Sequence, residues 1–333
     1  MEEDRKTLVK KVMDGEEADR IPVGFWWHYL TIQEQFSAVS DQSLIDRVIK
    51  GHKKTFDEFH PDFVKVMSDG FFADPSLCQG DLVGVDDLKR IKPIADDDPW
   101  IDKQVQMVKE ITEYYEGKVM TFYNVFSPLN VIRIYMEQHG NHGKDFVKMV
   151  INHPVEVNEA AMQLARNQKL LLEKLKSEVD IDGIYYSVQN IQSTKADWGF
   201  HCQYVMPSDK YLLDIINNKW KYNILHICGD GHFASDITFY KDYEASAYNW
   251  AVTTDKVSLK EGRDLFGKTV IGGFDNSSSG VLYSGTREAI KETVETIVRE
   301  TGRKGLIIGA DCTIPSDIDI DRLKYIRSVC RKE

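Results

Sequence analysis

The stretch TVIGGFDNSSSGVLYSGTREAIKETVETIVRETGRKGLIIGA, residues 269–310, contains one complete strand–helix–strand unit. Short apolar runs at Thr269–Phe274 and Gly305–Ala310 predict two strands, and apolar residues at three- and four-residue spacing over Thr286–Thr301 predict a helix between them. Gly302 and Gly305 are typical of a helix end that precedes a strand. A strand, a helix and a second strand in this order predict that the two strands pair in parallel.

The same alternation extends back to the N-terminus. Six earlier β-type runs predict strands at Ile21–Phe25, Phe63–Met67, Val119–Val125, Ile181–Tyr186, Tyr222–Cys228 and Ala245–Trp250. Helical spacing separates most of them, at Leu44–Phe59, Lys103–Tyr115, Val155–Val179, Ser208–Asn217 and the shorter Ser258–Phe266. Eight strands with intervening helices predict an α/β fold, a (β/α)8 TIM barrel that forms a single domain over residues 1–333, with its active site at the C-terminal ends of the strands.

An open doubly wound sheet is the structural alternative. It would need a glycine-rich phosphate loop after the first strand, and residues 24–28, GFWWH, do not form one. The long segment 68–118 between the second and third predicted strands is expected to form a lid or lip at one mouth of the barrel.

Composition excludes several classes of protein. The 333 residues carry a net charge of −11, which argues against a nucleic-acid-binding protein with a basic face and against attraction to anionic lipid. No apolar run approaches the roughly 18 residues of a membrane span, and no secretory signal is visible. Five thinly spread cysteines do not form a disulfide framework, so a cytoplasmic location is expected.

His226, Cys228 and Cys312 are the most informative polar residues at the predicted strand ends. Residues i and i+2 of a strand point to the same face, so His226 and Cys228 are expected to project together from the fifth strand. Cys312 follows the eighth strand. Three such ligands at one mouth predict a zinc site with an open fourth position, which is typical of a catalytic metal. The alternative is two ordinary buried cysteines.

Four short motifs resemble the uroporphyrinogen decarboxylase superfamily. They are LVKKVMDGEEADRIPV at 8–23, HICG at 226–229, the Gly272-Gly273 turn with SGTRE at 284–288, and GADCTIP at 309–315. The similarity extends from about residue 6 to about residue 327, and it implies the same (β/α)8 barrel.

The resemblance is closer to one branch of this superfamily than to the other. Decarboxylases carry an arginine-rich run after the first strand, where this chain has FWWHYL at 25–30, and a histidine where it has Cys312. Asp69 does match their substrate-binding aspartate. Cobalamin-dependent methyltransferases of the methylcobamide:coenzyme M type carry a His-x-Cys pair and a distant cysteine that bind zinc, and His226, Cys228 and Cys312 match that pattern.

The methyltransferase resemblance implies a reaction. Zn²⁺ would bind an acceptor thiol in its open position, because coordination deprotonates a thiol. The methyl donor would be a methylcorrinoid (cobalamin) carried on a separate corrinoid protein. The small-molecule acceptor, a thiol or a folate-like compound, is not identified. Two alternatives stay open, a porphyrinogen decarboxylase and a non-catalytic corrinoid-binding relative.

Further site residues follow from the predicted strand ends. His28, Asp69 and Asp311 are predicted to act in catalysis, with Asp311 orienting a metal ligand. Their alternatives are a structural histidine, a solvated carboxylate and a turn cap. The residues predicted to line the substrate site are Trp26, Trp27, Asn124, Gln189, Trp250 and Asp275. For the tryptophans the alternative is plain packing.

Overall fold

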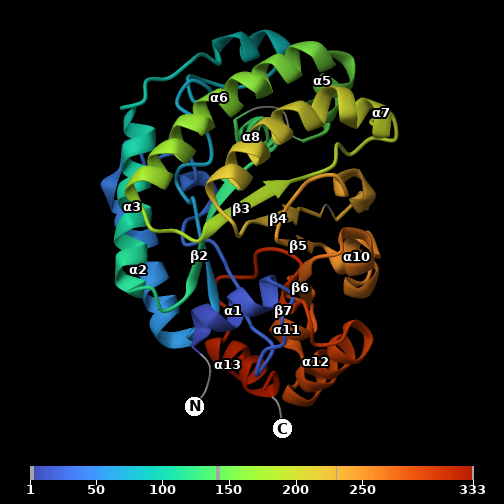
Figure 1. Ribbon diagram of the computed structural model, residues 1–333. Helices are drawn as coiled ribbons and strands as arrows, with labels where there is room; N and C mark the ends of the chain where they lie inside the picture. The colour runs from blue at the N-terminus through green and yellow to red at the C-terminus, as the bar shows by residue number, and fades with distance from the viewer. Residues whose placement is uncertain (1–3, 140–142, 230, 332–333) are drawn as a thin grey trace.

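A computed structural model describes residues 4–139, 143–229 and 231–331. Its centre is a sheet of seven parallel strands in which each strand pairs with the next along the chain (Figure 1). The strands are β1 (Phe63–Val66), β2 (Met120–Phe126), β3 (Gly183–Val188), β4 (Ile224–Ile227), β5 (Ala247–Trp250), β6 (Thr269–Phe274) and β7 (Leu306–Ala310). The α/β class and the parallel sheet are therefore confirmed.

The first predicted strand, Ile21–Phe25, does not form a regular strand. Val23 makes a single parallel bridge to Ile308 of β7, and the Gly24 N–H donates to the Ile308 carbonyl at 3.0 Å. Pro22 has no N–H to donate, and the Val23 N–H donates to the Asp62 carboxylate at 2.8 Å. The segment thus lies between β7 and the residue before β1, and seven of the eight expected strands are confirmed.

Helices surround the sheet (Figure 1). Their bounds are α1 (Arg5–Met13), α2 (Gln42–Phe59), α3 (Pro99–Tyr115), α4 (Pro128–Gln138), α5 (Gly143–Asn152), α6 (Pro154–Glu178), α7 (Trp198–Phe200), α8 (Met206–Lys219), α9 (Val252–Asp255), α10 (Leu259–Phe266), α11 (Val281–Ser284), α12 (Arg287–Thr301) and α13 (Ile320–Val329). The predicted helices are confirmed to within a few residues. No helix in the described part of the chain is long and apolar enough to cross a membrane.

Local capping explains why the helices begin and end where they do. The Thr286 hydroxyl accepts a hydrogen bond from the Ala289 N–H at 3.2 Å and starts α12. Gly302 follows the helix with a φ of 79°, a conformation that favours glycine. In α10, Ser258 and Glu261 form a reciprocal capping box.

The segment 68–118, predicted to form a lid or lip, contains regular elements and buried residues. It contains a 3₁₀ turn at Val85–Arg90 and then α3. Apolar residues of 73–91 are buried against α4, α5 and α6 in a second hydrophobic core.

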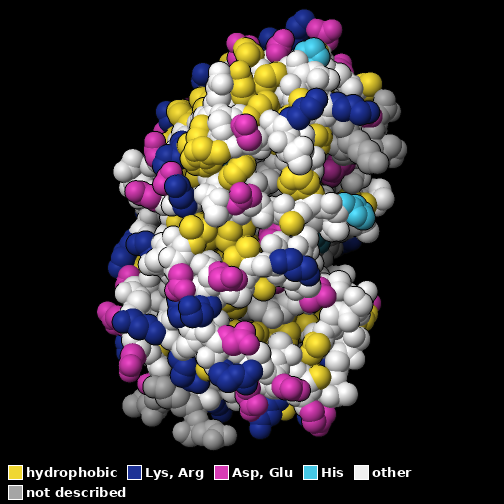
Figure 2. Space-filling view, turned by 90° about the vertical axis from the view of Figure 1, so that its right-hand side faces the viewer, with side chains coloured by type: hydrophobic (Ala, Val, Ile, Leu, Met, Phe, Trp, Pro, Cys, Tyr) yellow, Lys and Arg dark blue, Asp and Glu magenta, His cyan; other side chains and the backbone are white. Residues whose placement is uncertain are grey.

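Lys/Arg and Asp/Glu side chains are interspersed over the face of the molecule in Figure 2.

Alternation along the strands separates the interior from the helix layer. One apolar core fills the space inside the strands; its buried members on the strands and the segments flanking them are Trp26, Phe63, Met67, Met120, Phe122, Tyr185, Ile224, Ala247, Ile271 and Ile307. Toward the C-terminal ends, β3, β4 and β5 place Ser187, His226 and Asn249 in register with one another. These three polar side chains lie side by side on neighbouring strands, where the candidate site is found.

Candidate metal centre

The three predicted metal ligands converge at the C-terminal ends of β4 and β7. The Sγ atoms of Cys228 and Cys312 are 3.9 Å apart, and the Cys312 Sγ lies 3.5 Å from the His226 Nε2. All three ligand atoms lie within 4.8 Å of one another. The Cys228 N–H donates to the Val188 carbonyl at 2.8 Å and so continues the ladder beyond β4, which keeps Cys228 on the same face as His226.

The two separations that involve Cys312 fit a tetrahedral zinc ion. With Zn–S bonds of about 2.3 Å and a Zn–N bond of about 2.0 Å, two ligating sulfurs lie roughly 3.8 Å apart and sulfur and nitrogen roughly 3.6 Å apart. Among the described residues, no other His, Cys, Asp or Glu joins the group of three. Asp230, which follows Cys228 by two residues, lies outside the described part of the chain. The group could therefore hold zinc with one coordination position left for a ligand.

Asn249 fixes the tautomer of His226. The Asn249 amide nitrogen donates to the carbonyls of Ile271 and Ala310 at 2.9 and 3.0 Å, which leaves its Oδ1 as an acceptor. The His226 Nδ1–H donates to that oxygen at 2.5 Å, and the Tyr185 hydroxyl donates to it at 2.8 Å. The His226 Nε2 is then unprotonated and free to bind a metal.

The contact between the two cysteines shifts their pKa values in opposite directions. The hydrogen bond from Cys228, together with the nearby His226, holds the pKa of the Cys312 thiol well below its usual value. The same hydrogen bond and burial raise the pKa of Cys228 well above it. Because the thiolate is the form that binds metal, one ligand of the pair is already prepared for coordination.

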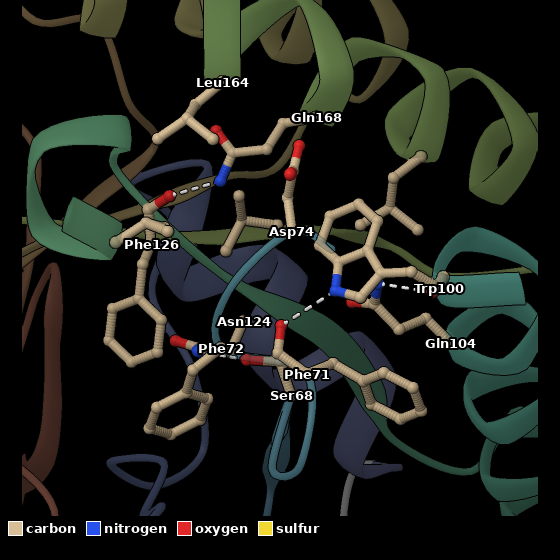
Figure 3. A pocket seen from close by; sticks show the side chains of 13 residues that line it. Ser68, Phe71, Phe72, Asp74, Trp100, Gln104, Asn124, Phe126, Leu164 and Gln168 are labelled. Atoms are coloured by element: carbon tan, nitrogen blue, oxygen red, sulfur yellow. Dashed lines mark hydrogen bonds between the residues drawn. The ribbon is translucent and has the colours of Figure 1, made fainter. Parts of the chain in front are cut away.

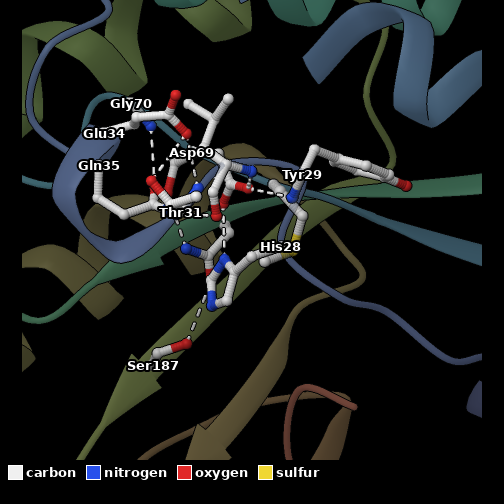
Figure 4. Close-up of polar contacts among 12 residues, drawn as sticks. His28, Tyr29, Thr31, Glu34, Gln35, Asp69, Gly70 and Ser187 are labelled. Atoms are coloured by element: carbon white, nitrogen blue, oxygen red, sulfur yellow. Dashed lines mark hydrogen bonds and ion pairs between the residues drawn. The ribbon is translucent and has the colours of Figure 1, made fainter. Parts of the chain in front are cut away.

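Asp69 and His28, predicted separately, form one unit. The His28 Nδ1 lies 2.7 Å from the Asp69 Oδ1, and the Asp69 Oδ2 accepts hydrogen bonds from the backbone N–H groups of Tyr29 and Leu30 (Figure 4). Asp69 is fully buried, so it is not a solvated loop carboxylate, whereas the His28 side chain is 35% exposed. The carboxylate therefore holds the loop after the first predicted strand and orients the imidazole.

Asp311 links the loops that follow β5 and β7. Its Oδ2 accepts a hydrogen bond from the Thr253 N–H at 2.7 Å. Its Oδ1 is buried without a partner among the described residues, and burial raises the pKa of the carboxyl to about 6. Asp311 therefore does not cap its own turn but fixes the backbone beside Cys312 to the neighbouring loop.

The predicted lining residues fall into different environments. Trp26 lies in the core inside the strands, against Tyr185, with ring centroids 5.3 Å apart. Trp27 and Trp250 instead belong to the core between sheet and helices. Trp250 donates its Nε1–H to the Val257 carbonyl at 2.9 Å. Because Asn249 faces inward, strand alternation turns Trp250 outward, and it packs the helix layer instead of lining the mouth.

Three polar lining residues are also placed. The Asn124 amide is buried between the hydroxyls of Ser68 and Ser187, at 2.8 and 3.3 Å. The Gln189 Nε2 donates to the Gly229 carbonyl at 3.2 Å, next to Cys228, and its Oε1 is buried without a partner among the described residues. Asp275 accepts the Ser277 N–H within its own turn at 2.8 Å.

A separate small cavity of about 20 Å³ has Asn124 in its wall (Figure 3). Its wall is mostly aromatic and aliphatic, with Trp100 donating to the Phe71 carbonyl and Gln168 to the Phe126 carbonyl. None of the three candidate metal ligands contributes to it. The chemistry that the cysteines and histidine could support therefore lies elsewhere, at the ends of β4 and β7.

No role was predicted from the sequence for Asn249, Tyr185 or Lys65. Strand alternation could have identified Asn249, because it is in register with His226 on the neighbouring strand. Lys65 is a charged residue inside the apolar run Phe63–Met67. Such a residue in a buried strand is a sign of an interior polar site.

The chain is similar in sequence to one protein family and in fold to solved structures. The family model described as "Uroporphyrinogen decarboxylase (URO-D)" matches residues 75–333. A solved methyltransferase from Methanosarcina mazei has a TM-score of 0.72 at 14% identity, covering 98% of each chain, and so has a similar fold. A putative vitamin-B12-independent methionine synthase from Listeria monocytogenes has a TM-score of 0.49 at 12% identity, covering 95% of this chain and 98% of its own. Comparison with curated proteins gives no match.

Proposed function

Because the chain belongs to the uroporphyrinogen decarboxylase family, we propose that it is a zinc-dependent methyltransferase that moves a methyl group from a methylated corrinoid to a thiol. The observation that carries this proposal is the convergence of His226, Cys228 and Cys312 with spacings that suit tetrahedral zinc. The donor set also suits the metal, since borderline-soft Zn²⁺ binds thiolate and imidazole ligands.

Zinc would supply one kind of chemistry at this centre, by binding the acceptor thiol as a thiolate and so activating its sulfur. The protein's own residues prepare that position. His226 offers Nε2 because Asn249 accepts its Nδ1–H. Cys228 and Cys312 would supply two negative charges that neutralise the metal. One position is left for the acceptor, as in catalytic zinc sites.

His28 is the proposed carrier of the proton that the acceptor thiol loses. Its Nδ1 is hydrogen-bonded to Asp69, which leaves the Nε2 of the neutral ring available to accept a proton. Its side chain is 35% exposed, so the proton can pass on to solvent. Phe72 packs against the His28 ring, with centroids 5.6 Å apart, and limits its movement.

The methyl donor and the acceptor are proposed from the family resemblance. The donor would be a methylcorrinoid presented by a separate corrinoid protein, and the acceptor a small thiol or a folate-like compound. With a thiol acceptor, a sulfur–carbon bond forms while the cobalt–carbon bond breaks, and the electron pair of the broken bond stays with the corrinoid.

A porphyrinogen decarboxylase is less well supported. Bidentate arginines suit the several carboxylates of such a substrate. The segment 25–30, FWWHYL, contains no arginine. Its Trp26 packs in the core inside the strands and its Trp27 in the helix layer, and neither side chain carries a charge.

Metal content after purification without chelator tests the proposal, on wild type and on Cys312→Ser. About one zinc per chain is expected in wild type, with most of it lost in the variant. Methyl transfer from methylcobalamin to a panel of thiols should then require the metal. A folded wild-type protein that contains no metal and cannot be reconstituted with zinc would overturn the proposal.

A further inference from the structure

Lys65 is the one lysine whose side chain is buried in the described part of the chain, with 5% of its surface exposed. It lies on β1 between Phe63 and Met67, two members of the core inside the strands. The neighbours Val64 and Val66 belong instead to the core beneath the helices. Alternation therefore directs Lys65 into the barrel interior.

The ammonium group of Lys65 rests on aromatic rings. Its Nζ lies 4.1 Å from the ring centroid of Tyr185 and 5.5 Å from that of Trp26. Among the described residues, none is seen to form an ion pair or hydrogen bond with it. Cation–π contacts compensate only part of the free-energy cost of burying a charge. A buried cation of this kind is expected to have an anionic counterpart.

Tyr185 connects Lys65 to the metal centre. The Lys65 Nζ lies 4.1 Å from the centroid of the Tyr185 ring, and that centroid lies 5.5 Å from the centroid of the His226 imidazole. Burial lowers the pKa of Lys65 to about 8, and the nearby Cys312, Cys228 and Asp69 act against this shift by favouring the charged ammonium form. Asp69 is already occupied by His28 and two backbone N–H groups. The thiolates of the metal centre are therefore the negative charges that Lys65 can stabilise.

The net charge of the metal centre indicates which kind of fourth ligand a nearby lysine would stabilise. Zn²⁺ with two thiolates and a neutral imidazole carries no net charge, so a neutral ligand in the open position leaves the centre neutral. A thiolate in that position adds one negative charge in a buried environment, where an opposite charge has a large effect.

We propose that Lys65 stabilises the thiolate form of the acceptor at the open position and makes the centre select an anionic ligand over a neutral one. This role rests on the proposed zinc-dependent activation of a thiol. Lys65 acts through its charge and is a specificity-determining residue, whereas the three metal ligands are expected to stay bound without it.

Cobalt substitution tests the role by a spectroscopic measurement that does not depend on turnover. Co²⁺-loaded wild type, Lys65→Met, Lys65→Arg and the control Lys103→Met are titrated with 2-mercaptoethanol and, separately, with imidazole. Lys103 is a partly buried lysine on α3 that donates to the Val39 carbonyl. Thiolate binding is followed by sulfur-to-cobalt charge-transfer absorption, and imidazole binding by the ligand-field bands.

Lys65→Met is expected to bind 2-mercaptoethanol about tenfold more weakly or worse, because a nearby charge is lost at a buried site. Its cobalt content and its affinity for imidazole should match wild type, and Lys65→Arg and Lys103→Met should keep the thiolate affinity. Equal thiolate binding in Lys65→Met and wild type would overturn the role of Lys65. So would an equal loss of thiolate and imidazole, which indicates a structural defect.

Two further outcomes separate this role from the proposed function. Wild type that binds cobalt but no thiol would overturn the proposed function itself, whatever Lys65 does. If Lys65→Met does not fold, as judged by thermal unfolding, Lys65→Gln replaces it and the same comparisons decide the question.

Discussion

The Nδ1 of His226 lies 2.5 Å from the Oδ1 of Asn249, and two backbone carbonyls fix the orientation of that amide. Asn249→Ala should therefore release the imidazole and lower zinc affinity about 10- to 100-fold, the usual cost of removing a residue that orients a metal-ligating histidine. Competition with a chromophoric chelator measures the affinity.

Asn223→Ala is the matched control for this substitution. Asn223 is also a buried asparagine, adjoining the opposite end of β4, where it accepts the Ile184 N–H at 2.9 Å. Its loss should destabilise the fold and leave zinc affinity per folded chain unchanged. Equal zinc affinities in Asn249→Ala and wild type would contradict the orienting role of Asn249.

His28→Ala and Asp69→Ala should have different effects. Asp69 is fully buried and accepts the Tyr29 N–H at 2.6 Å, so its removal leaves buried donors unpaired and should lower the free energy of unfolding by about 1–3 kcal/mol. His28 is partly exposed, so its removal should slow methyl transfer with little loss of stability. Urea denaturation and methyl-transfer rates measure the two effects; a large loss of stability in His28→Ala would show that the histidine is mainly structural.

Much of the fold is predictable because its signals are local. Short apolar runs identified seven strands, and apolar residues at helical spacing identified helices between them. Caps such as Thr286 and Gly302 mark helix ends in the sequence itself. The first strand was the exception, because the Val23 N–H pairs with the side chain of Asp62, 39 residues away. No periodic pattern reveals such a contact. The helix α4 was also missed, although Ser127 before Pro128 is a typical helix start.

The candidate site was predictable only as far as strand alternation reaches. The i, i+2 spacing placed His226 and Cys228 on one face, and strand ends brought Cys312 near them. Asn249 and Lys65 act across strands, so their roles depend on register, which the sequence does not state. Alternation could have corrected the prediction for Trp250, since it follows the inward-facing Asn249.

Asp62→Ala tests how the N-terminal segment is fastened to the sheet. Arg20, part of the family-like motif at 8–23, donates both terminal nitrogens to the Asp62 carboxylate at 2.5 Å, and both side chains are buried. Removing one partner of such a pair should lower the free energy of unfolding by about 3–5 kcal/mol. Chemical denaturation measures this loss. Asp214→Ala, an exposed surface change on α8, is the control and should cost little; similar losses in both variants would contradict the fastening role.

Asp209 should make stability depend on pH through a network remote from the metal centre. Its buried carboxylate accepts hydrogen bonds from the hydroxyls of Tyr186 and Tyr243, each at 2.9 Å. Burial raises its pKa from 3.8 to about 7, so the folded state holds this proton more tightly than the unfolded state does. The contribution of Asp209 to stability is therefore greatest below the unfolded pKa and is lost as the pH rises through about 7.

The difference between Asp209→Asn and wild type isolates this contribution. Buried His52 and His201 act in the opposite direction, because burial lowers their pKa values to about 3 and 4. In urea denaturation, the free energy of unfolding of Asp209→Asn minus that of wild type should rise between pH 5 and 7 by up to about 1.4 kcal/mol per pH unit, the value for one proton. The same difference for the exposed control Asp214→Asn should stay flat. A flat difference for Asp209→Asn as well would mean that the carboxyl is already ionised at pH 5 in the folded protein.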